Sequence, residues 1–138
     1  MKHLTLFLLS ITFLFTSCGT IKVSNSDAIV EYPDVEAQYP GGAKAMSKYL
    51  ANNIKYPEIA MELGDQGRVF VEFVIEKDGS ISNVRVLRGV SNEIDAESVR
   101  VVSNMKNWTP AIYKRKYVRA RARIPINYIL EWNTFGSS

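Results

Sequence analysis

The side chains best suited to acid–base, nucleophilic and transition-metal chemistry are almost absent from this chain. It contains one histidine, His3, and one cysteine, Cys18. Imidazole is the usual proton carrier near neutral pH, and imidazole and thiolate are the usual protein ligands of zinc and similar metals. Both residues lie close to the N-terminus, and cleavage before Cys18 would leave a mature chain without histidine. We therefore expect binding and not catalysis.

Three carboxylates that lie close together in the sequence, Glu72, Glu76 and Asp78, are the remaining candidates for chemistry. A carboxylate pair could serve a glycosidase, and a carboxylate cluster could hold a metal ion. Glu72 and Glu76, however, fall on the solvent face of a predicted strand, and Asp78 falls in the turn that follows it. We predict no catalytic residue, no metal site and no cofactor, so the chain is not expected to be an enzyme.

The first residues have the pattern of a secretory signal. Lys2 and His3 give a polar start, residues 4–15 are mostly apolar, and small residues precede Cys18. The apolar stretch is shorter than the ~20 residues that cross a bilayer, which disfavours an uncleaved membrane helix. The pattern resembles the lipobox of bacterial lipoproteins, in which the cysteine becomes the lipidated first residue of the mature protein.

We accordingly expect residues 1–17 to be a signal peptide and Cys18 to carry a lipid. The lipid would hold the protein in the cell envelope, facing the periplasm and most simply at the outer membrane. Residues 18–38 are polar, lack sustained periodicity and are expected to be a flexible tether. The rest of the chain can form one small domain, predicted at 39–132, with a tail at 133–138. The formal net charge of +3 is too small to indicate a nucleic-acid partner.

Glycine, proline and hydrophobic periodicity divide the predicted domain into elements. In chain order these are a helix between Pro40-Gly41-Gly42 and Tyr56-Pro57, a further turn at 58–63, strands at 68–76 and 81–88 joined at Asp78-Gly79, a helix from Ser91 or Asn92 to Trp108, and a strand at 117–130. The economical packing is an antiparallel sheet with both helices on one face. The predicted class is α+β, with a three-stranded antiparallel sheet and the order α-β-β-α-β.

The last predicted strand alternates strictly, which is typical of a half-buried strand. Pro125 has no N–H to donate, so this strand is predicted to lie at a sheet edge or to be paired on one side at that point. The apolar face comprises Val118, Ala120, Ala122, Ile124, Ile126, Tyr128 and Leu130, and the other face comprises Arg119, Arg121, Arg123, Pro125 and Asn127.

Several residues permit two interpretations. The basic residues at 114–123 could form a solvated strand face or contact an acidic partner or a lipid surface. Tyr56 could line a peptide groove or be an ordinary packed tyrosine after a helix. Trp108 lies on the apolar stripe of its predicted helix, which favours a core role over an exposed docking role. Asp95 is expected to act at the start of its helix, where the dipole favours negative charge.

The ordered set of motifs resembles the TonB C-terminal domain, in the form common among Bacteroidetes-type proteins. The resemblance runs from about Tyr39 to Leu130, and no single piece of it is specific. The carrying stretches are Tyr39-Pro40-Gly41-Gly42, Tyr56-Pro57, Gln66-Gly67-Arg68-Val69, Lys77-Asp78-Gly79-Ser80-Ile81, Val86-Leu87-Arg88-Gly89-Val90, Ile94-Asp95-Ala96-Glu97, Trp108-Thr109-Pro110-Ala111 and Ile124-Pro125-Ile126.

The resemblance implies a function in the bacterial envelope. TonB proteins connect a proton-driven motor of the inner membrane to outer-membrane receptors, and their C-terminal domain grips a receptor peptide, the TonB box, as an added strand. Such a strand would use free main-chain groups at a sheet edge. The expected partner-binding residues lie before Tyr-Pro and in the last strand; they are Asn52, Asn53, Lys55, Tyr56, Tyr117, Arg119, Arg121, Arg123, Ile124 and Ile126.

The sequence departs from the usual energy transducer in its N-terminal part. Such a transducer begins with an uncleaved transmembrane helix and a long Pro-rich spacer, whereas this chain has a lipobox and a short tether. We therefore expect the binding half of TonB without the half that engages the motor. The alternative is a structural lipoprotein that pairs its edge strand with a second copy and forms a homodimer.

Overall fold

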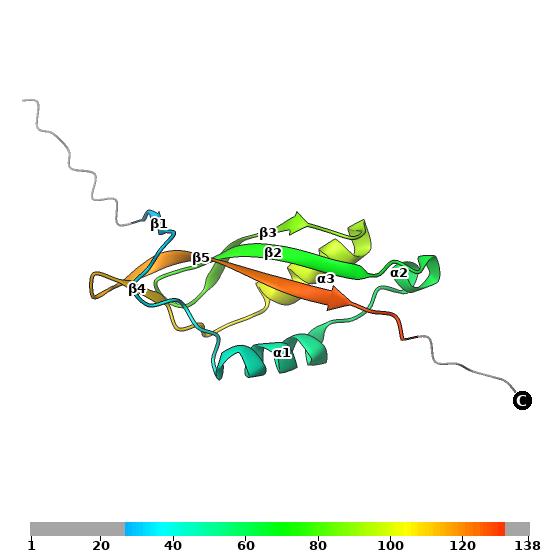
Figure 1. Cartoon of the computed structure of the whole chain (residues 1–138), viewed down its shortest axis with the longest axis horizontal. Helices are drawn as coiled ribbons and strands as arrows, with labels where there is room; N and C mark the ends of the chain where they lie inside the picture. The colour runs from blue at the N-terminus through cyan, green and yellow to red at the C-terminus, as the bar shows by residue number, and fades with distance from the viewer. Residues whose placement is uncertain (1–26, 132–138) are drawn as a thin grey trace, which may run out of the picture.

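The structure, a computed structural model, describes residues 27–131, which form an elongated sheet with helices packed against it (Figure 1). The expected signal peptide, Cys18 and the tail at 133–138 lie outside the described residues. Among residues 27–131, no helix is both long enough and apolar enough to cross a membrane. The element bounds are β1 (Ile29–Val30), α1 (Gly42–Asn53), α2 (Glu58–Leu63), β2 (Gly67–Ile75), β3 (Ile81–Arg88), α3 (Asn92–Ser103), β4 (Ala111–Tyr113) and β5 (Lys116–Tyr128).

The predicted α+β class and its three main strands are present, but the sheet is larger than predicted. The strand order is β1-β5-β2-β3, and β4 also pairs with β5. The two extra strands, β1 and β4, have two and three residues. Segments this short carry no readable periodicity, so the sequence pattern missed them. As a result β5 is flanked by β1 and β4 at its beginning and only its later part can be a sheet edge.

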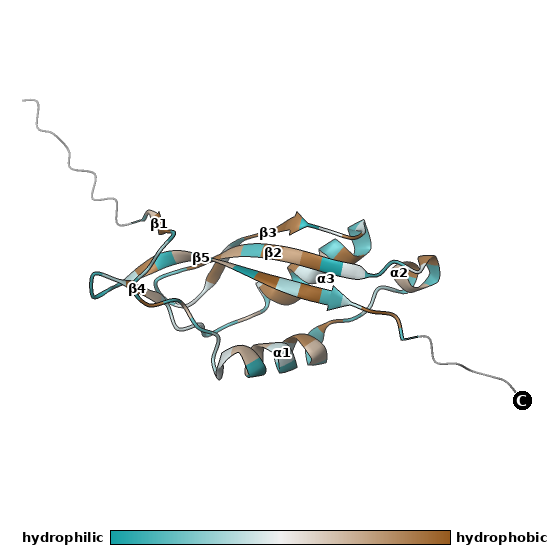
Figure 2. Cartoon of the chain, in the orientation of Figure 1, coloured by the Kyte–Doolittle hydropathy of each residue, from teal (hydrophilic) through white to brown (hydrophobic). Residues whose placement is uncertain are grey.

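The long antiparallel pairing of β2 with β5 forms the centre of the sheet. It runs from Gly67 opposite Tyr128 to Ile75 opposite Ala120. Apolar and polar residues alternate along β5 (Figure 2), and the predicted assignment of its faces is confirmed: Ala120, Ile124, Ile126 and Tyr128 are buried. They pack with apolar residues of β2 and α3 in one hydrophobic core. Burying this apolar face is the main stabilising contribution to the domain.

Both helices cover the apolar face of the sheet, as predicted. From α3, Ile94, Val101 and Val102 are fully buried. Helix α1 has no buried residue and lies at the periphery, where a stripe that includes Met46 and Leu50 packs against the core. Peripheral packing of this kind leaves room between α1 and the sheet.

Helix α3 is shorter than predicted: it ends at Ser103, whereas the sequence pattern predicted a helix to Trp108. The chain turns at Asn107, whose φ is 60°, and the Trp108 N–H donates to the carbonyl of Gly79 at 3.2 Å. Gly79 lies in the β2–β3 turn with φ +82°, and a Cβ there would come within 2.1 Å of the Trp108 carbonyl oxygen. This close approach carries Trp108 from the end of α3 into the core, where it is 7% exposed. The predicted core role of Trp108 is confirmed.

The segment expected to be a flexible tether is folded over its second half. Besides β1, Val35 pairs with Ile112 and Gln38 pairs with Thr109 in antiparallel bridges. The main chain of this segment hydrogen-bonds to backbone groups of β4, β5 and the residues before β4 that would otherwise lack a partner. Such contacts do not depend on side-chain hydropathy, so the hydropathy pattern could not predict them. The folded domain therefore begins before residue 39, and only residues 18–26 of the expected tether lie outside the described part.

Candidate functional site

One stretch of β5 has a strand partner on one side only. Lys116–Val118 pair with β4, and Arg119 and Ala120 pair with β1. From Arg121 to Tyr128, β5 pairs with β2 alone within the part of the chain that the structure describes. We call this stretch the open edge. Unpaired N–H and C=O groups along a strand are a template for another extended segment.

Pro125 indicates which backbone groups point outward at the open edge. In an antiparallel pair, alternate residues direct both backbone groups toward the partner strand and the residues between direct them away. Pro125 lies opposite Phe70 of β2 and lacks an N–H, so it disturbs no ladder bond if it points away from β2. Alternation then directs the N–H and C=O of Arg121, Arg123 and Asn127 outward as well. These groups are available to an added strand.

A groove of about 460 Å³ lies beside the open edge, between its residues 122–124 and the beginning of α1. We call it the α1–β5 groove. Its apolar lining includes Tyr39, Met46, Trp108, Ala122 and Ile124. The Tyr39 ring contacts the Trp108 ring edge-on at 5.4 Å, and Trp108 contacts Phe73 of β2 in the same way at 5.4 Å. The aromatic stack ties the wall of the groove to the core.

The outer face of the sheet carries an ion-pair cluster that begins at Glu72. Although Glu72 points to the face predicted as solvated, it is only 3% exposed, because arginines cover it. Arg85 donates to its Oε1 at 2.9 Å, Arg123 donates to its Oε2 at 2.8 Å, and Arg121 lies 3.4 Å from Oε1. Burial acts to raise the pKa of Glu72, but hydrogen bonds from Arg123 and Arg85 outweigh it and hold this pKa below its usual value.

A second pair extends the cluster along the strand. Arg119 donates to Glu76 at 2.7 Å, and this hydrogen bond lowers the pKa of Glu76 and raises that of Arg119. Arg121 also lies 3.3 Å from Glu31. The arginines of β5 are thus paired with carboxylates across the sheet and do not form a simple solvated face. The alternation of the sequence placed them on one face but could not reveal their partners.

The structure brings only part of the predicted partner-binding set to the open edge. Arg121 and Arg123 lie on it, and so do Ile124 and Ile126, whose side chains are 5% and 2% exposed and face the core. By the same alternation their backbone N–H and C=O groups point toward β2, so the isoleucines offer no outward main-chain group, and Ile124 could meet a partner only as part of the lining of the α1–β5 groove. Tyr117 and Arg119 lie earlier on β5, where β4 and β1 already pair with the strand.

The segment before Tyr56-Pro57 lies against α3 and not against the open edge. Glu97 of α3 accepts a hydrogen bond from the Lys55 N–H at 2.7 Å, and Arg100 donates to the Asn53 carbonyl at 2.8 Å. Asn52, the residue before it, is exposed. These contacts fix the end of α1, and they do not place its polar side chains beside β5.

Tyr56 reaches the end of β5. Its ring packs edge-on against Tyr128 at 5.5 Å, and its hydroxyl donates to the carbonyl of Asp65. Burial raises the pKa of the Tyr56 phenol. This geometry is that of a packed tyrosine at the end of the strand.

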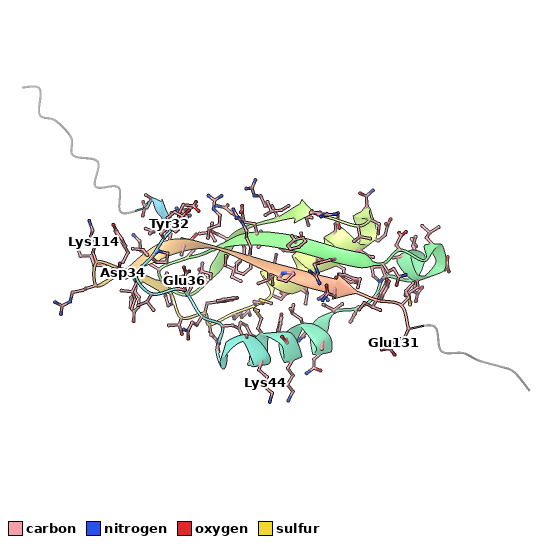
Figure 3. All side chains as sticks on the ribbon, in the orientation of Figure 1. Tyr32, Asp34, Glu36, Lys44, Lys114 and Glu131 are labelled. Atoms are coloured by element: carbon pink, nitrogen blue, oxygen red, sulfur yellow. The ribbon has the colours of Figure 1, made fainter. Side chains whose placement is uncertain are left out.

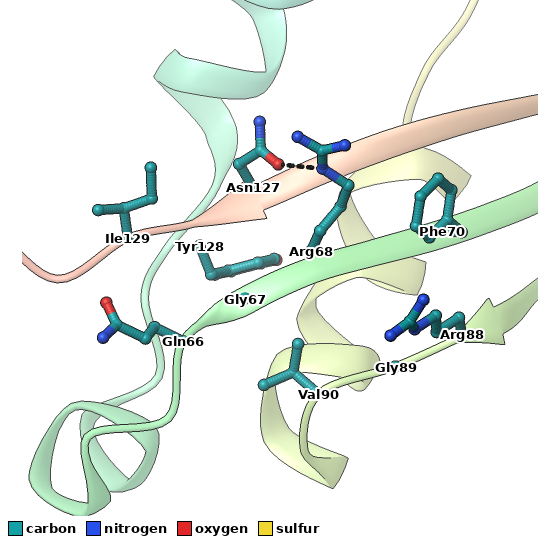
Figure 4. A pocket seen from close by; sticks show the side chains of 10 residues that line it. All are labelled: Gln66, Gly67, Arg68, Phe70, Arg88, Gly89, Val90, Asn127, Tyr128 and Ile129. Carbon is teal, nitrogen blue, oxygen red and sulfur yellow. Dashed lines mark hydrogen bonds between the residues drawn. The ribbon is translucent and has the colours of Figure 1, made fainter.

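Two other surface features lie at the ends of the sheet. A hollow of about 810 Å³ at the end of β5 is lined by Arg68, Phe70 and Arg88, and in it Arg68 donates to Asn127 at 2.8 Å (Figure 4). At the opposite end, Lys114 (Figure 3) and Arg115 form the tip of the β4–β5 hairpin. Their φ values are 48° and 64°. No group of three or more His, Cys, Asp or Glu residues suited to a metal ion occurs within residues 27–131.

The α1–β5 groove is the part of the site that sequence analysis missed. The sequence pattern predicts a core role for Trp108 and places Tyr39 at the start of the domain, and it links neither residue to the last strand. Residues 39, 46, 108 and 122–124 are far apart in the sequence, and no local pattern predicts that they line one groove. The only usable signal was the resemblance of the whole motif set to a known domain.

Comparisons with known proteins agree with the geometry. The family described as Gram-negative bacterial TonB protein C-terminal matches residues 52–130. The solution structure of the Helicobacter pylori TonB C-terminal domain, residues 179–285, is 21% identical, covers 62% of this chain and 78% of that one, and gives a TM-score of 0.51.

Two further solution structures give lower scores. A shorter form of the H. pylori domain, residues 194–285, is 22% identical over 64% of this chain and 92% of that one, with a TM-score of 0.49. The Pseudomonas aeruginosa TonB domain is 30% identical over 56% and 78%, with a TM-score of 0.44. No match is found among curated proteins.

Proposed function

The chain belongs to the Gram-negative TonB protein C-terminal family, and from this premise we propose that it binds a receptor segment by strand addition at the open edge of β5. The family is associated with TonB-dependent transport in the Gram-negative cell envelope, and its domains are non-enzymatic modules that interact with outer-membrane receptors. The proposed partner is the TonB box, an extended periplasmic peptide of such a receptor.

The observation that carries this proposal is the open edge itself. Between Arg121 and Tyr128, β5 has a full ladder with β2 on one side and no strand on the other within residues 27–131. An extended peptide gains main-chain hydrogen bonds there without any rearrangement of the sheet. The second edge strand, β3, is less suitable, because its pairing with β2 has register shifts and Asn83 has a φ of 52°. Bulges of this kind protect an edge from further pairing.

The chain supplies its own example of strand addition to β5. Ile29 and Val30 pair in parallel with Arg119 and Ala120, directly before the open edge begins. The same side of the strand thus accepts an extended segment by main-chain contacts. A receptor peptide that pairs with Arg121–Tyr128 would continue the line of β1.

The expected strength of such an interaction is moderate. Each main-chain hydrogen bond contributes about 1 kcal/mol net, and a peptide of five or six residues can make about four of them. Ordering the peptide offsets a part of this gain. The main-chain contacts alone therefore support weak binding, with a Kd of about 1 mM or above.

The experiment that tests the proposal removes one outward N–H from the open edge. Arg123→Pro deletes the N–H and the guanidinium, whereas the matched variant Arg123→Ala deletes the guanidinium alone. Synthetic peptides from the N-terminal periplasmic segment of an outer-membrane receptor of the same organism are titrated against each protein, and circular dichroism confirms that both remain folded. We expect Arg123→Ala to bind and Arg123→Pro to lose binding. Equal binding by the two variants contradicts strand addition at this edge.

The same titration separates the alternative in which the domain is structural. A protein that binds no receptor peptide but sediments as a dimer, with the dimer lost in Arg123→Pro, would be using its open edge for self-association. The location in the envelope is a separate part of the proposal, in which Cys18 carries the lipid. Incorporation of labelled fatty acid into the wild type and not into Cys18→Ala would support it, and equal labelling of both would refute it.

A further inference from the structure

The α1–β5 groove lies where the side chains of an added strand would fall. Its wall on the sheet side is formed by residues 122–124 of the open edge, and its other wall is formed by the beginning of α1. Ala122 and Ile124 are on the apolar face of β5, so the groove opens below the edge, on the core side of the sheet. A strand that continues the sheet at Arg123 must direct every second side chain to this side.

The lining of the groove determines what such a side chain should be. Tyr39, Met46 and Trp108 present apolar surface, and the groove's volume of about 460 Å³ lies in the range of small ligand pockets. No charged side chain other than Arg123, which points to the opposite face and pairs with Glu72, contributes to the lining. A charged side chain in the groove would lose its hydration without gaining an ionic partner. A large aliphatic or aromatic side chain would bury apolar area against three residues.

Trp108 provides a second observation at the groove. Its indole N–H is buried and has no acceptor among the described residues. Buried donors without an acceptor are uncommon in native proteins, and each calls for an explanation. An added strand brings main-chain carbonyl groups to this part of the molecule, and a peptide seated against Trp108 also changes the environment of the indole. The indole N–H is therefore a local reporter of occupancy.

We propose that the α1–β5 groove is a specificity pocket that accepts one large apolar side chain of the peptide added at β5, and that it thereby fixes the register of that peptide. The inference rests on the proposed function, because without strand addition nothing positions a side chain over the groove. Main-chain pairing alone cannot discriminate between sequences or registers, since every residue carries the same backbone groups. A single apolar pocket beside Arg123 supplies that discrimination.

The outer face of the sheet adds a preference that concerns charge: it selects the two residues that flank the pocket residue in the added strand. The neighbours of the pocket residue in the added strand would lie beside Arg121 and Arg123. The local cluster holds three arginines, including Arg85, against the carboxylates of Glu72 and Glu31. Because cations are in excess there, basic residues at these two positions are disfavoured and acidic or neutral residues are accepted. The preferred segment is an extended one with an apolar residue between two non-basic residues.

The test uses host peptides of threonine with one guest position, Ac-Thr-Thr-Xaa-Thr-Thr-NH2, in which Xaa is Leu, Ala or Lys. Binding to the full chain is followed by the Trp108 indole N–H signal in NMR titrations, assigned with Trp132→Phe. The expected order is Leu above Ala by about tenfold, from partial burial of the added carbons, with Lys weakest. The groove is then filled with Ala43→Trp, an exposed position of α1 that lines it. The matched control is Ala51→Trp, on the same helix and exposed but outside the groove.

The outcomes distinguish this inference from the proposed function. If Ala43→Trp removes the preference for Leu and Ala51→Trp keeps it, the pocket is established. If Leu and Ala peptides bind equally and both are lost in Arg123→Pro, strand addition stands and the specificity pocket is refuted. If the preference for Leu persists in Arg123→Pro, the groove binds side chains without an added strand, and the inference as stated fails. If neither the host peptides nor the receptor peptides bind at concentrations of several millimolar, both the inference and the proposed function fail.

Discussion

Substitution of Gly79 by alanine tests the contact that places Trp108 at the groove. Gly79 has φ +82°, and an alanine Cβ would lie 2.1 Å from the Trp108 carbonyl oxygen and 3.5 Å from its nitrogen. Alanine in the left-handed region costs about 1–2 kcal/mol. Relief of the overlap requires the chain at Trp108 to move by about an ångström, and overpacking of this kind costs a further ~1–3 kcal/mol. We expect Gly79→Ala to lower the free energy of unfolding by about 2–5 kcal/mol.

Gly64 provides a matched control for the backbone effect. Its φ is +71°, close to that of Gly79, but a Cβ added there meets nothing within 4 Å. Gly64→Ala therefore carries the left-handed strain of about 1–2 kcal/mol without the overlap. Both substitutions also restrict the unfolded chain by the same amount, so this contribution cancels in the comparison.

The assay is urea and thermal unfolding of the two variants and the wild type, followed by circular dichroism. For a domain of this size, a difference of 1–3 kcal/mol between the variants corresponds to about 5–20 °C in Tm. We expect a lower Tm for Gly79→Ala than for Gly64→Ala. The Trp108 indole N–H signal of Gly79→Ala should also be displaced in NMR spectra. Equal losses of stability in the two variants would refute the reasoning, because the Trp108 carbonyl would then not be held over the turn.

Other predictions concern the ion-pair cluster and the hairpin tip. The pKa of Glu72 is lowered in the folded state. Its contribution to stability is therefore complete above the ordinary glutamate pKa of about 4.3 and is lost as the pH falls through the lowered pKa of the folded state. Urea unfolding midpoints measured between pH 2 and 7 follow this loss. Glu72→Gln should cost about 1–3 kcal/mol at pH 7 and flatten that profile, and an unchanged profile would mean that Glu72 does not carry it. The double substitution Lys114→Asn with Arg115→Gly should raise stability by about 1–2 kcal/mol, because both residues have positive φ and Asn-Gly prefers this turn; a lower Tm would contradict this.

The main strands illustrate how far local pattern reaches. The alternation of residues 118–128 predicted the buried and exposed faces of β5 correctly, and Asp78-Gly79 located the hairpin between β2 and β3. Pairing on one side at Pro125 was also predicted, because a missing N–H is a property of the residue itself. These results depend on periodicity and on backbone chemistry, both of which are encoded within a few neighbouring residues.

The shortened α3 and the buried Glu72 illustrate where local pattern fails. The apolar stripe continued to Trp108, but the helix ends at Ser103, and the Trp108 N–H donates to the carbonyl of Gly79, which belongs to another turn. Glu72 was correctly assigned to the polar face, yet its burial depends on arginines from β3 and β5. Neither partner is near in the sequence, and the free energy of each contact depends on a distance that only folding fixes.

The sequence by itself determined the class of the fold and which face of each long strand is buried. Its ordered motifs also indicated the TonB C-terminal family. It also indicated a binding module, since the residues usual in catalysis are scarce. Only the tertiary structure decided which part of β5 remains open, because β1 and β4 are too short to have a period and pair through backbone groups that every residue shares. It likewise decided that Tyr39, Met46 and Trp108 line one groove beside that edge. Their proximity arises from packing between elements distant in the chain, and no spacing of residues encodes it.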